Sequence, residues 1–152
     1  MESATRSDKY AEFARAFLKL AENDLQRAEA ALERKDWADT LFRAQQVVEK
    51  AVKALLELNH FFESTHDLSK HFLEIVVRKE KEDVNTMNQI LETLEWFAGK
   101  WQDTRYPHIS KGKVVLPEDV YGQEQAMEAF QRAHSVFDAI VKVLKKKYAL
   151  SL

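Results

Sequence analysis

The chain has 152 residues, of which 45% are hydrophobic and 32% charged, a balance that suits a water-exposed domain with a core of its own. Its formal net charge of −2 excludes an overall positive field for nucleic-acid binding, and the absence of cysteine excludes disulfides and thiolate chemistry. Only 3 glycines and 2 prolines interrupt the sequence, which favours a few long helices over many short strands.

Two long helices are predicted in the first part of the chain. Residues 8–34 carry apolar side chains at steps of three or four, as on one face of a helix. A very short turn around Lys35 leads to a second helix, which Asp36 can cap and which we expect to fray near Asn59. Its apolar positions alternate by three and four, a pattern typical of near-antiparallel packing. These positions are Leu41, Ala44, Val48, Ala51, Leu55 and Leu58.

Three further helices are predicted after residue 64. A short helix follows a cap at Thr65 or Asp67, and a fourth helix carries apolar residues from Met87 to Trp101. The fifth runs from about residue 118 to 148, with Met127 facing inward. We therefore expect an all-α fold, an antiparallel up-and-down helical bundle of four long helices plus one short helix, forming a single domain over residues 1–152.

Residues 103–117 are predicted to form one long irregular loop, because two prolines and a glycine interrupt them. Long loops inside compact domains are often functional. This loop carries three cations, Arg105, Lys111 and Lys113, against one acid. An arginine fork beside the ring of Tyr106 offers a phosphate donor next to a stacking surface, the two features that a nucleotide needs.

A structural interpretation of the same loop stays open. Tyr106 and Pro107 could pin the segment to the bundle, while Arg105 pairs with a carboxylate at the end of a helix. The positions of the guanidinium group and of the loop lysines in the folded chain decide between the two interpretations.

A second group of polar residues lies on the predicted second helix. Gln46, Lys50 and Lys53 are spaced by four and three residues, so they share a face beside the apolar seam. An ordinary solvated face would look the same, since Glu49 and Glu57 can each pair with Lys53 along the helix.

No metal or cofactor site is expected. Glu57 and His60, and likewise Glu63 and His66, have the spacing seen in di-metal bundles, but such centres draw these motifs from two separate helices. Here both motifs lie within ten residues at one helix end. The sequence also contains no Gly-rich phosphate loop.

The sequence predicts a cytoplasmic protein without a membrane segment. Its first residues are polar, unlike the apolar stretch of a signal peptide. No stretch approaches the roughly 18 apolar residues that a membrane-spanning helix requires.

Several motifs follow one another in a recognisable order. They are Asp24-Leu25, Asp36-Trp37, the run from Ala44 to Leu56 that contains Glu49-Lys50, Thr65-His66-Asp67-Leu68, and Thr104-Arg105-Tyr106-Pro107. In this combination, over nearly the whole chain, they resemble a HEPN domain. The resemblance implies a helical bundle, frequent homodimers, and nucleotide binding beside a separately encoded nucleotidyltransferase partner in toxin–antitoxin-like pairs. It marks as ligand-binding candidates Lys50, Lys53, His66, Arg105 and Tyr106.

The resemblance also raises the question of catalysis. One branch of the family consists of metal-independent ribonucleases, marked by an arginine and a histidine with four to six residues between them. No arginine of this chain meets that spacing; Arg105 reaches His108 after only two residues. We therefore expect a non-catalytic nucleotide-binding module, with a nucleotide rather than RNA as ligand. The alternatives are a ribonuclease toxin with an atypical Arg105 and His108 site, or a purely structural protein-interaction bundle.

Overall fold

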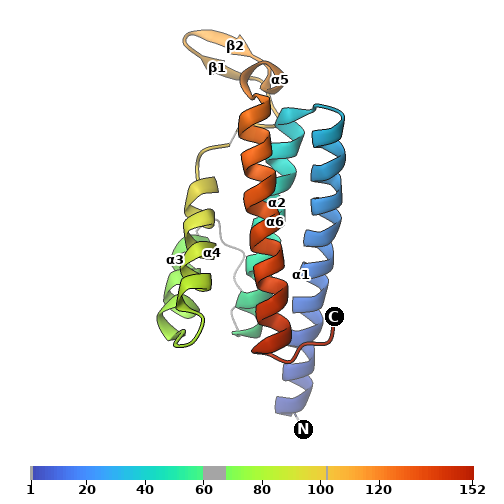
Figure 1. Ribbon diagram of the computed structural model, residues 1–152, viewed down its shortest axis with the longest axis vertical. Helices are drawn as coiled ribbons and strands as arrows, with labels where there is room; N and C mark the ends of the chain where they lie inside the picture. Colours follow the sequence, from blue (N-terminus) through green and yellow to red (C-terminus); the bar gives the residue numbers. More distant parts are fainter. Residues whose placement is uncertain (1, 60–67, 102) are drawn as a thin grey trace.

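The computed structural model describes residues 2–59, 68–101 and 103–152. Its elements in chain order are α1 (Glu2–Glu33), α2 (Trp37–Leu58), α3 (Leu68–Ile75), the short 3-10 helix η1 (Val77–Lys79), α4 (Val84–Phe97), β1 (His108–Ser110), β2 (Lys113–Val115), α5 (Pro117–Val120) and α6 (Gln123–Lys146). The long helices α1, α2, α4 and α6 alternate in direction along one axis, and α3 lies beside α4 (Figure 1). The predicted all-α, up-and-down bundle is confirmed.

The turn between α1 and α2 forms as the sequence predicts. Lys35 adopts a positive φ of 64°, and the N–H groups of Lys35 and Asp36 donate to the carbonyls of Leu32 and Ala31 at 3.1 and 2.9 Å. This pattern closes the end of α1 with a Schellman motif. The carboxylate of Asp36 then accepts a hydrogen bond from the N–H of Asp39 at 3.2 Å, which caps α2.

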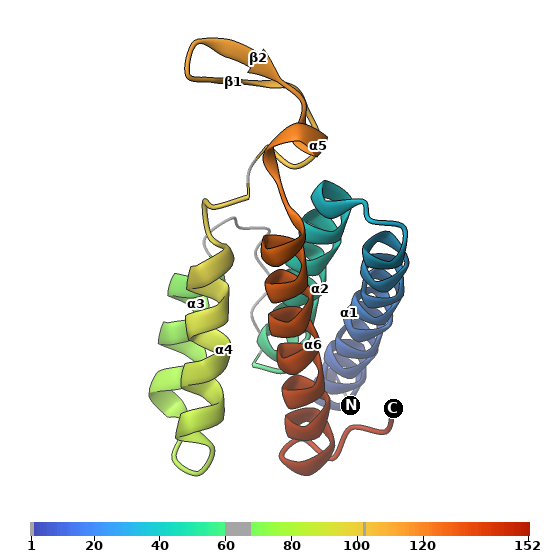
Figure 2. The same ribbon diagram turned by 45° about the horizontal axis from the view of Figure 1, so that its top comes forward.

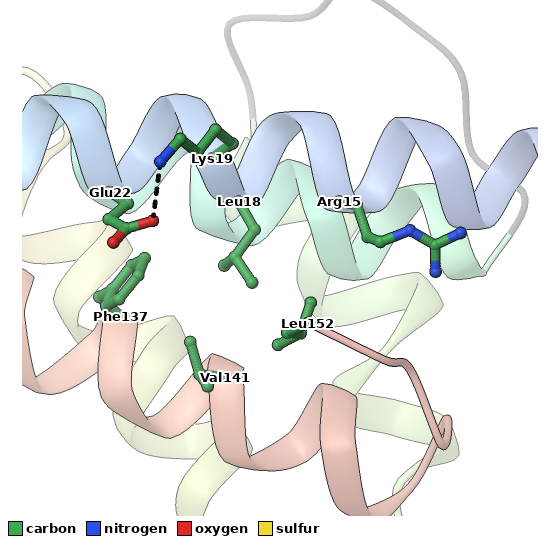
Figure 3. A pocket seen from close by; sticks show the side chains of 7 residues that line it. All are labelled: Arg15, Leu18, Lys19, Glu22, Phe137, Val141 and Leu152. Carbon is green, nitrogen blue, oxygen red and sulfur yellow. Dashed lines mark ion pairs between the residues drawn. The ribbon is translucent and has the colours of Figure 1, made fainter.

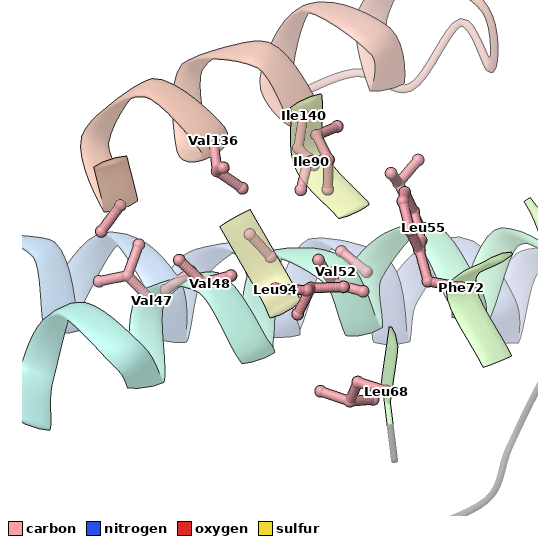
Figure 4. Packing of buried hydrophobic residues seen from close by; sticks show 14 of the residues in the cluster. Val47, Val48, Val52, Leu55, Leu68, Phe72, Ile90, Leu94, Val136 and Ile140 are labelled. Atoms are coloured by element: carbon pink, nitrogen blue, oxygen red, sulfur yellow. The ribbon is translucent and has the colours of Figure 1, made fainter. Parts of the chain in front are cut away.

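Helix α2 is the central element of the bundle, since it contacts α1, α3, α4 and α6. Burial of each large aliphatic side chain in such a core contributes about 1.5–3 kcal/mol. The core residues labelled in Figure 4 come from α2, α3, α4 and α6, and they are Val47, Val48, Val52, Leu55, Leu68, Phe72, Ile90, Leu94, Val136 and Ile140. Because these contacts fix the inner side of α2, the side chains on its outer side are attached to a rigid helix.

A buried carboxylate joins the start of α4 to the end of α6. The side chain of Glu80 is 1% exposed, and its Oε1 accepts hydrogen bonds from the backbone N–H groups of Lys81, Glu82 and Asp83. Its Oε2 accepts a hydrogen bond from Lys147 Nζ. The bond from the Asp83 backbone, and after it the bond from Lys147, lowers the pKa of Glu80 to about 2. The same contact raises the pKa of Lys147.

The prediction of one continuous helix over residues 118–148 is wrong in its first part. Tyr121 and Gly122 are extended and separate the one-turn α5 from α6. Tyr121 is only 9% exposed, and its ring packs on Trp101 at a centroid distance of 5.7 Å. The N–H of Gly122 donates to Gln125 Oε1 at 2.9 Å, so α6 begins with a cap of its own. The chain leaves its helical path because the Tyr121 ring is held in the core.

Two other residues assigned to the apolar seams lie elsewhere. Met127, expected to face inward, is 41% exposed on α6. Trp101, expected to continue the seam of the fourth helix, lies beyond Phe97, where α4 ends. Its ring still packs against the core and contacts Trp96 at a centroid distance of 5.5 Å. Helical spacing therefore showed neither that Met127 lies on an exposed face of α6 nor that α4 ends before Trp101.

The predicted irregular loop contains a β-hairpin. Its antiparallel pairs are His108 with Val115, Ile109 with Val114, and Ser110 with Lys113. Between the strands, Lys111 and Gly112 have φ values of 51° and 78°. Two central residues with positive φ suit the twist of a tight two-residue hairpin turn. β2 covers Lys113–Val115, which the sequence predicts as part of an irregular loop, and the hairpin projects past the end of the bundle (Figure 2).

Within the described residues, every helix is too short or too polar to cross a lipid bilayer. The predicted cytoplasmic location stays a prediction.

Candidate functional site

Arg105 lies against the outer side of α2. Its guanidinium carbon is 4.4 Å from the ring centroid of Phe42, and the guanidinium carbon of Arg43 is 5.3 Å from the same centroid. Thr104, the residue before Arg105, is only 6% exposed and fixes the chain at this point. Arg105 itself is exposed, and in the described part of the chain no carboxylate lies within ion-pair distance of it. Its hydrogen-bond donors therefore face solvent.

A buried carboxylate organises the cations next to this contact. The side chain of Asp24, on α1, is 1% exposed and accepts a hydrogen bond from Lys50 Nζ. Arg27 approaches the same carboxylate at 3.0 Å and Arg43 at 3.6 Å. Arg43 also pairs with Asp39 at 3.5 Å, although its buried Nε has no hydrogen-bond partner among the described residues. One buried negative charge thus holds three cations along the junction of α1 and α2.

These contacts define a surface that we call the α2 cationic face. On α2, Phe42, Gln46, Lys50 and Lys53 follow at steps of four, four and three, so they form one row along the helix. Arg105 from the loop contacts Phe42, the first residue of this row. The α2 cationic face consists of Phe42, Arg43, Gln46, Lys50, Lys53 and Arg105. Lys53 is half-buried and belongs to no ion pair within the described residues.

The loop lysines lie in a different place. Lys111 is at the tip of the hairpin and Lys113 begins β2, and both are exposed where the hairpin projects from the bundle (Figure 1). His108 begins β1 and is half-buried, with its Nδ1 buried and unpaired within the described residues. The predicted basic residues of the loop therefore divide into two groups. Arg105 lies against α2, whereas His108, Lys111 and Lys113 belong to the hairpin.

Tyr106 and His66 are the remaining predicted residues in or near the loop. Tyr106 is 68% exposed, so its ring is open to a stacking partner rather than pinned to the bundle. His66 lies outside the described residues, as do the proposed caps Thr65 and Asp67. The base of the loop is held by other aromatics, since Trp101 before it packs on Tyr121 after it. Burial, and after it the charge of Asp103, raises the pKa of Tyr121.

Phe42, Arg43, Arg27 and Asp24 were missed as site residues by the sequence interpretation. One signal was present for Asp24, because an acid stands among the apolar positions of the first helix. A charge at a buried position of a helix requires a partner of opposite charge. No comparable signal indicated Phe42, since the ring becomes part of the face only when Arg105 reaches it from the loop.

The acidic residue of the possible metal motif is buried alone. Glu57 is 6% exposed, its Oε2 has no hydrogen-bond partner among the described residues, and burial raises its pKa. His60, Glu63 and His66, the other members of the motif, lie outside the described residues. Within the residues described, no group of three or more potential ligands is placed to hold a metal ion.

A groove elsewhere in the molecule has a different character. It lies between α1 and α6 and has a volume of about 330 Å³ (Figure 3). Leu18, Val141 and Leu152 point toward its middle, and Lys19 pairs with Glu22 at 3.6 Å along one side. Of the predicted ligand-binding residues that the structure describes, none lines this groove. Its largely apolar wall lacks the converging donors that a phosphate requires.

A family model described as the HEPN domain matches residues 14–144. The chain belongs to the HEPN family. The protein named Putative toxin MJ1304, from Methanocaldococcus jannaschii, is 33% identical to this HEPN chain over 140 residues, which cover 91% of this chain and 92% of the relative.

Two crystal structures share the HEPN bundle. TT1696 from Thermus thermophilus aligns with a TM-score of 0.62 and 24% identity, covering 85% of this chain and 96% of its own. ST0689, described as an archaeal HEPN homologue, aligns with a TM-score of 0.65 and 23% identity, covering 87% and 98%. At such low identity these two structures show the common fold alone.

Proposed function

We propose that this chain is a toxin-like HEPN module that binds a nucleotide or nucleotidyl group and acts with a separately encoded nucleotidyltransferase. The observation that supports this most is the position of Arg105, over the ring of Phe42 and without a carboxylate partner in the described chain. The relative from Methanocaldococcus jannaschii, by its name, supports the toxin-like part of the proposal.

The α2 cationic face suits a phosphate-bearing ligand chemically. A guanidinium held over an aromatic ring keeps its in-plane N–H donors free for two phosphate oxygens. Each charge-assisted hydrogen bond of this kind contributes about 1.5–3 kcal/mol. Lys50 and Lys53 follow on the same helix, and Tyr106 next to Arg105 offers an exposed ring for a base. Asp24, together with Asp39 beside Arg43, carries two negative charges against the three cations that Asp24 holds. Lys53 and Arg105, which have no carboxylate partner in the described chain, add two further positive charges to the face.

Nucleotide binding is tested by calorimetry and thermal denaturation with ATP, AMP and pyrophosphate. We expect at least one of them, at millimolar concentration, to raise the melting temperature of the wild-type chain. Arg105→Ala should weaken its binding about tenfold or more, because the variant loses a bidentate charge-assisted contact. Lys145→Ala is the control, since Lys145 is exposed in the last turn of α6. Absence of any shift with all three compounds, together with equal behaviour of Arg105→Ala, would refute the proposal.

The partner and the assembly are tested separately. We expect the chain to be a homodimer by light scattering and to form a complex with a co-expressed nucleotidyltransferase encoded beside it. We also expect that expression of the chain alone slows growth and that co-expression of the partner restores it. Normal growth in both cases would contradict the toxin-like part while leaving nucleotide binding to be judged by calorimetry.

The ribonuclease alternative gains no support from the geometry. Arg105 lies over α2, whereas His108 belongs to the hairpin and has its Nδ1 buried. Within the described residues no hydrogen bond or ring contact joins the two side chains. A general acid and its phosphate-binding partner have to converge on one scissile group.

A further inference from the structure

The hairpin has one covered face and one open face. Strand alternation places His108 and Val115 on one side and Ile109 and Val114 on the other. His108 and Val115 are half-buried, so their side leans toward the rest of the chain. Ile109 and Val114 are 75% and 74% exposed, the highest values among the large hydrophobic residues that the structure describes. Leu116 continues the open side with an exposure of 45%.

This open face is unusual for a small sheet. A pair of strands is marginally stable in water unless a face packs on something else, and here the β-branched pair Ile109 and Val114 is left largely exposed. Both outer edges of the pair also lack a neighbouring strand among the described residues. Open edges and exposed aliphatic residues at a projecting tip are typical of a surface that another chain covers. Figures 1 and 2 show that the bundle leaves this tip free.

The charges around the open face limit what can cover it. Lys111 lies in the turn and Lys113 directly follows it, Arg105 lies at the base of the hairpin, and no Asp or Glu occurs between residues 104 and 117. The complementary surface is therefore acidic. Two hairpins of two copies would bring their lysines together, which disfavours a symmetric contact between copies. Ile109 and Val114 have no ring to stack on a base and no polar atom to hydrogen-bond with a base edge, so a protein surface fits better than a nucleic acid.

We propose that the β1–β2 hairpin is a docking element for a partner protein whose contact surface is apolar at its centre and carries carboxylates at its rim. Ile109, Val114 and Leu116 fill the centre of this contact, and Lys111 and Lys113 pair with the rim. The open edge of β1 or β2 is available for a strand of the partner. The docking surface is separate from the α2 cationic face and does not depend on nucleotide binding.

The test begins with the full chain in the cells that produce it. A photocrosslinking amino acid is placed at Ile109, at Val114, or at the control position Leu20, which is 46% exposed on α1. Irradiation should give the same protein adduct at Ile109 and Val114 and not at Leu20. The adduct is identified by mass spectrometry, and that protein is then purified for binding measurements with the unlabelled chain.

Variants of the hairpin decide whether the adduct reflects docking. Ile109→Asp and the double variant Lys111→Glu with Lys113→Glu should each raise the Kd for the purified partner about 30-fold or more, because they oppose the apolar centre and the acidic rim. Leu20→Asp and Lys145→Glu should leave it unchanged, and all variants should keep the wild-type melting temperature. The proposal is overturned by adducts to RNA or to a second copy, by equal adducts at Leu20, by no adduct, or by hairpin variants that bind normally.

Discussion

Lys147 follows the last residue of α6 and Arg105 lies over Phe42 near the start of α2, and these two helix ends lie at opposite ends of the bundle (Figure 1). The two side chains carry the same charge, but their surroundings differ. Lys147 donates to Glu80, a carboxylate that is 1% exposed and that also accepts three backbone N–H groups. Arg105 lies over an aromatic ring, and no carboxylate of the described chain pairs with it. The charge of Lys147 is therefore satisfied within the fold, whereas the charge of Arg105 faces solvent.

The difference separates structural charges from charges that are available to a ligand. An ion pair whose carboxylate is buried and hydrogen-bonded adds to the free energy of unfolding through these contacts. Removal of one partner leaves the other without compensation for its charge. An exposed cation without a partner adds little to the free energy of unfolding, so its replacement should affect binding rather than folding. Variants at the two ends should therefore change different measured quantities.

Removal of Glu80 should give the largest effect. Glu80→Ala leaves three backbone N–H groups and Lys147 without their acceptor at the junction of α4 and α6. We expect a loss of about 3–4 kcal/mol in the free energy of unfolding, measured by urea denaturation. Glu82→Ala, in the same turn but exposed, should change it by less than about 0.5 kcal/mol. Similar values for the two variants would contradict a structural role of the buried carboxylate.

The buried Glu80 should also make the free energy of unfolding depend on pH in the acid range. The pKa of Glu80 is lowered to about 2 in the folded chain, from an ordinary value of 4.5, so the unfolded chain takes up the proton first. The contribution is therefore complete above pH 4.5 and is lost as the pH falls toward 2. We expect wild type to exceed Glu80→Gln by about 3 kcal/mol at pH 6 and to match it near pH 2. A constant difference between the two proteins over this range would show that the charge is not responsible.

Conservative replacement of Arg105 should have a smaller effect, and on binding alone. Lysine keeps the charge but loses the planar group over Phe42, so Arg105→Lys should weaken nucleotide binding about five- to tenfold at unchanged stability. Arg132 provides a matched control, because its guanidinium carbon lies 4.6 Å from the ring centroid of Trp96. Arg132→Lys should leave nucleotide affinity unaltered. If both variants lose stability and neither loses affinity, the Arg105 contact is structural.

The fold could be predicted from the sequence wherever one local signal sufficed. The turn at Lys35, the cap at Asp36 and the seam of α2 depend on neighbouring residues, and all three were found. The break at Tyr121 and Gly122 was not, because it depends on a ring held by Trp101 from another part of the chain. The hairpin was missed because its strands have three residues each and its turn is Lys-Gly rather than Asn-Gly.

The candidate site shows the same limit more strongly. Helical spacing predicted that Lys50 and Lys53 share a face, and composition indicated a basic loop around Arg105. The contact of Arg105 with Phe42, and the three cations around Asp24, are tertiary contacts between residues distant in sequence. The division of the loop into Arg105 on α2 and Lys111 and Lys113 on the hairpin could not be predicted either, since it follows from the path of the folded chain.

The smallest effects are expected at the hairpin turn, and they should stay local. Lys111 has a positive φ of 51°, which a lysine adopts less readily than asparagine, so Lys111→Asn should stabilise the turn by about 0.5 kcal/mol. Gly112→Ala should weaken the turn by about 1 kcal/mol, because an alanine is strained at a φ of 78°. A steric clash adds nothing to this cost, since an added Cβ would meet no atom within 4 Å. Hydrogen exchange of the strand amides should slow in the first variant and quicken in the second.

Neither change at the turn should alter the urea midpoint of the whole chain, since the hairpin projects from the bundle (Figure 2) and Ile109 and Val114 are largely exposed. A shift of that midpoint in step with the exchange rates would mean that the hairpin unfolds together with the core. The two ends of the molecule would then be one cooperative unit, and the lysines at the tip could no longer be treated as independent of folding.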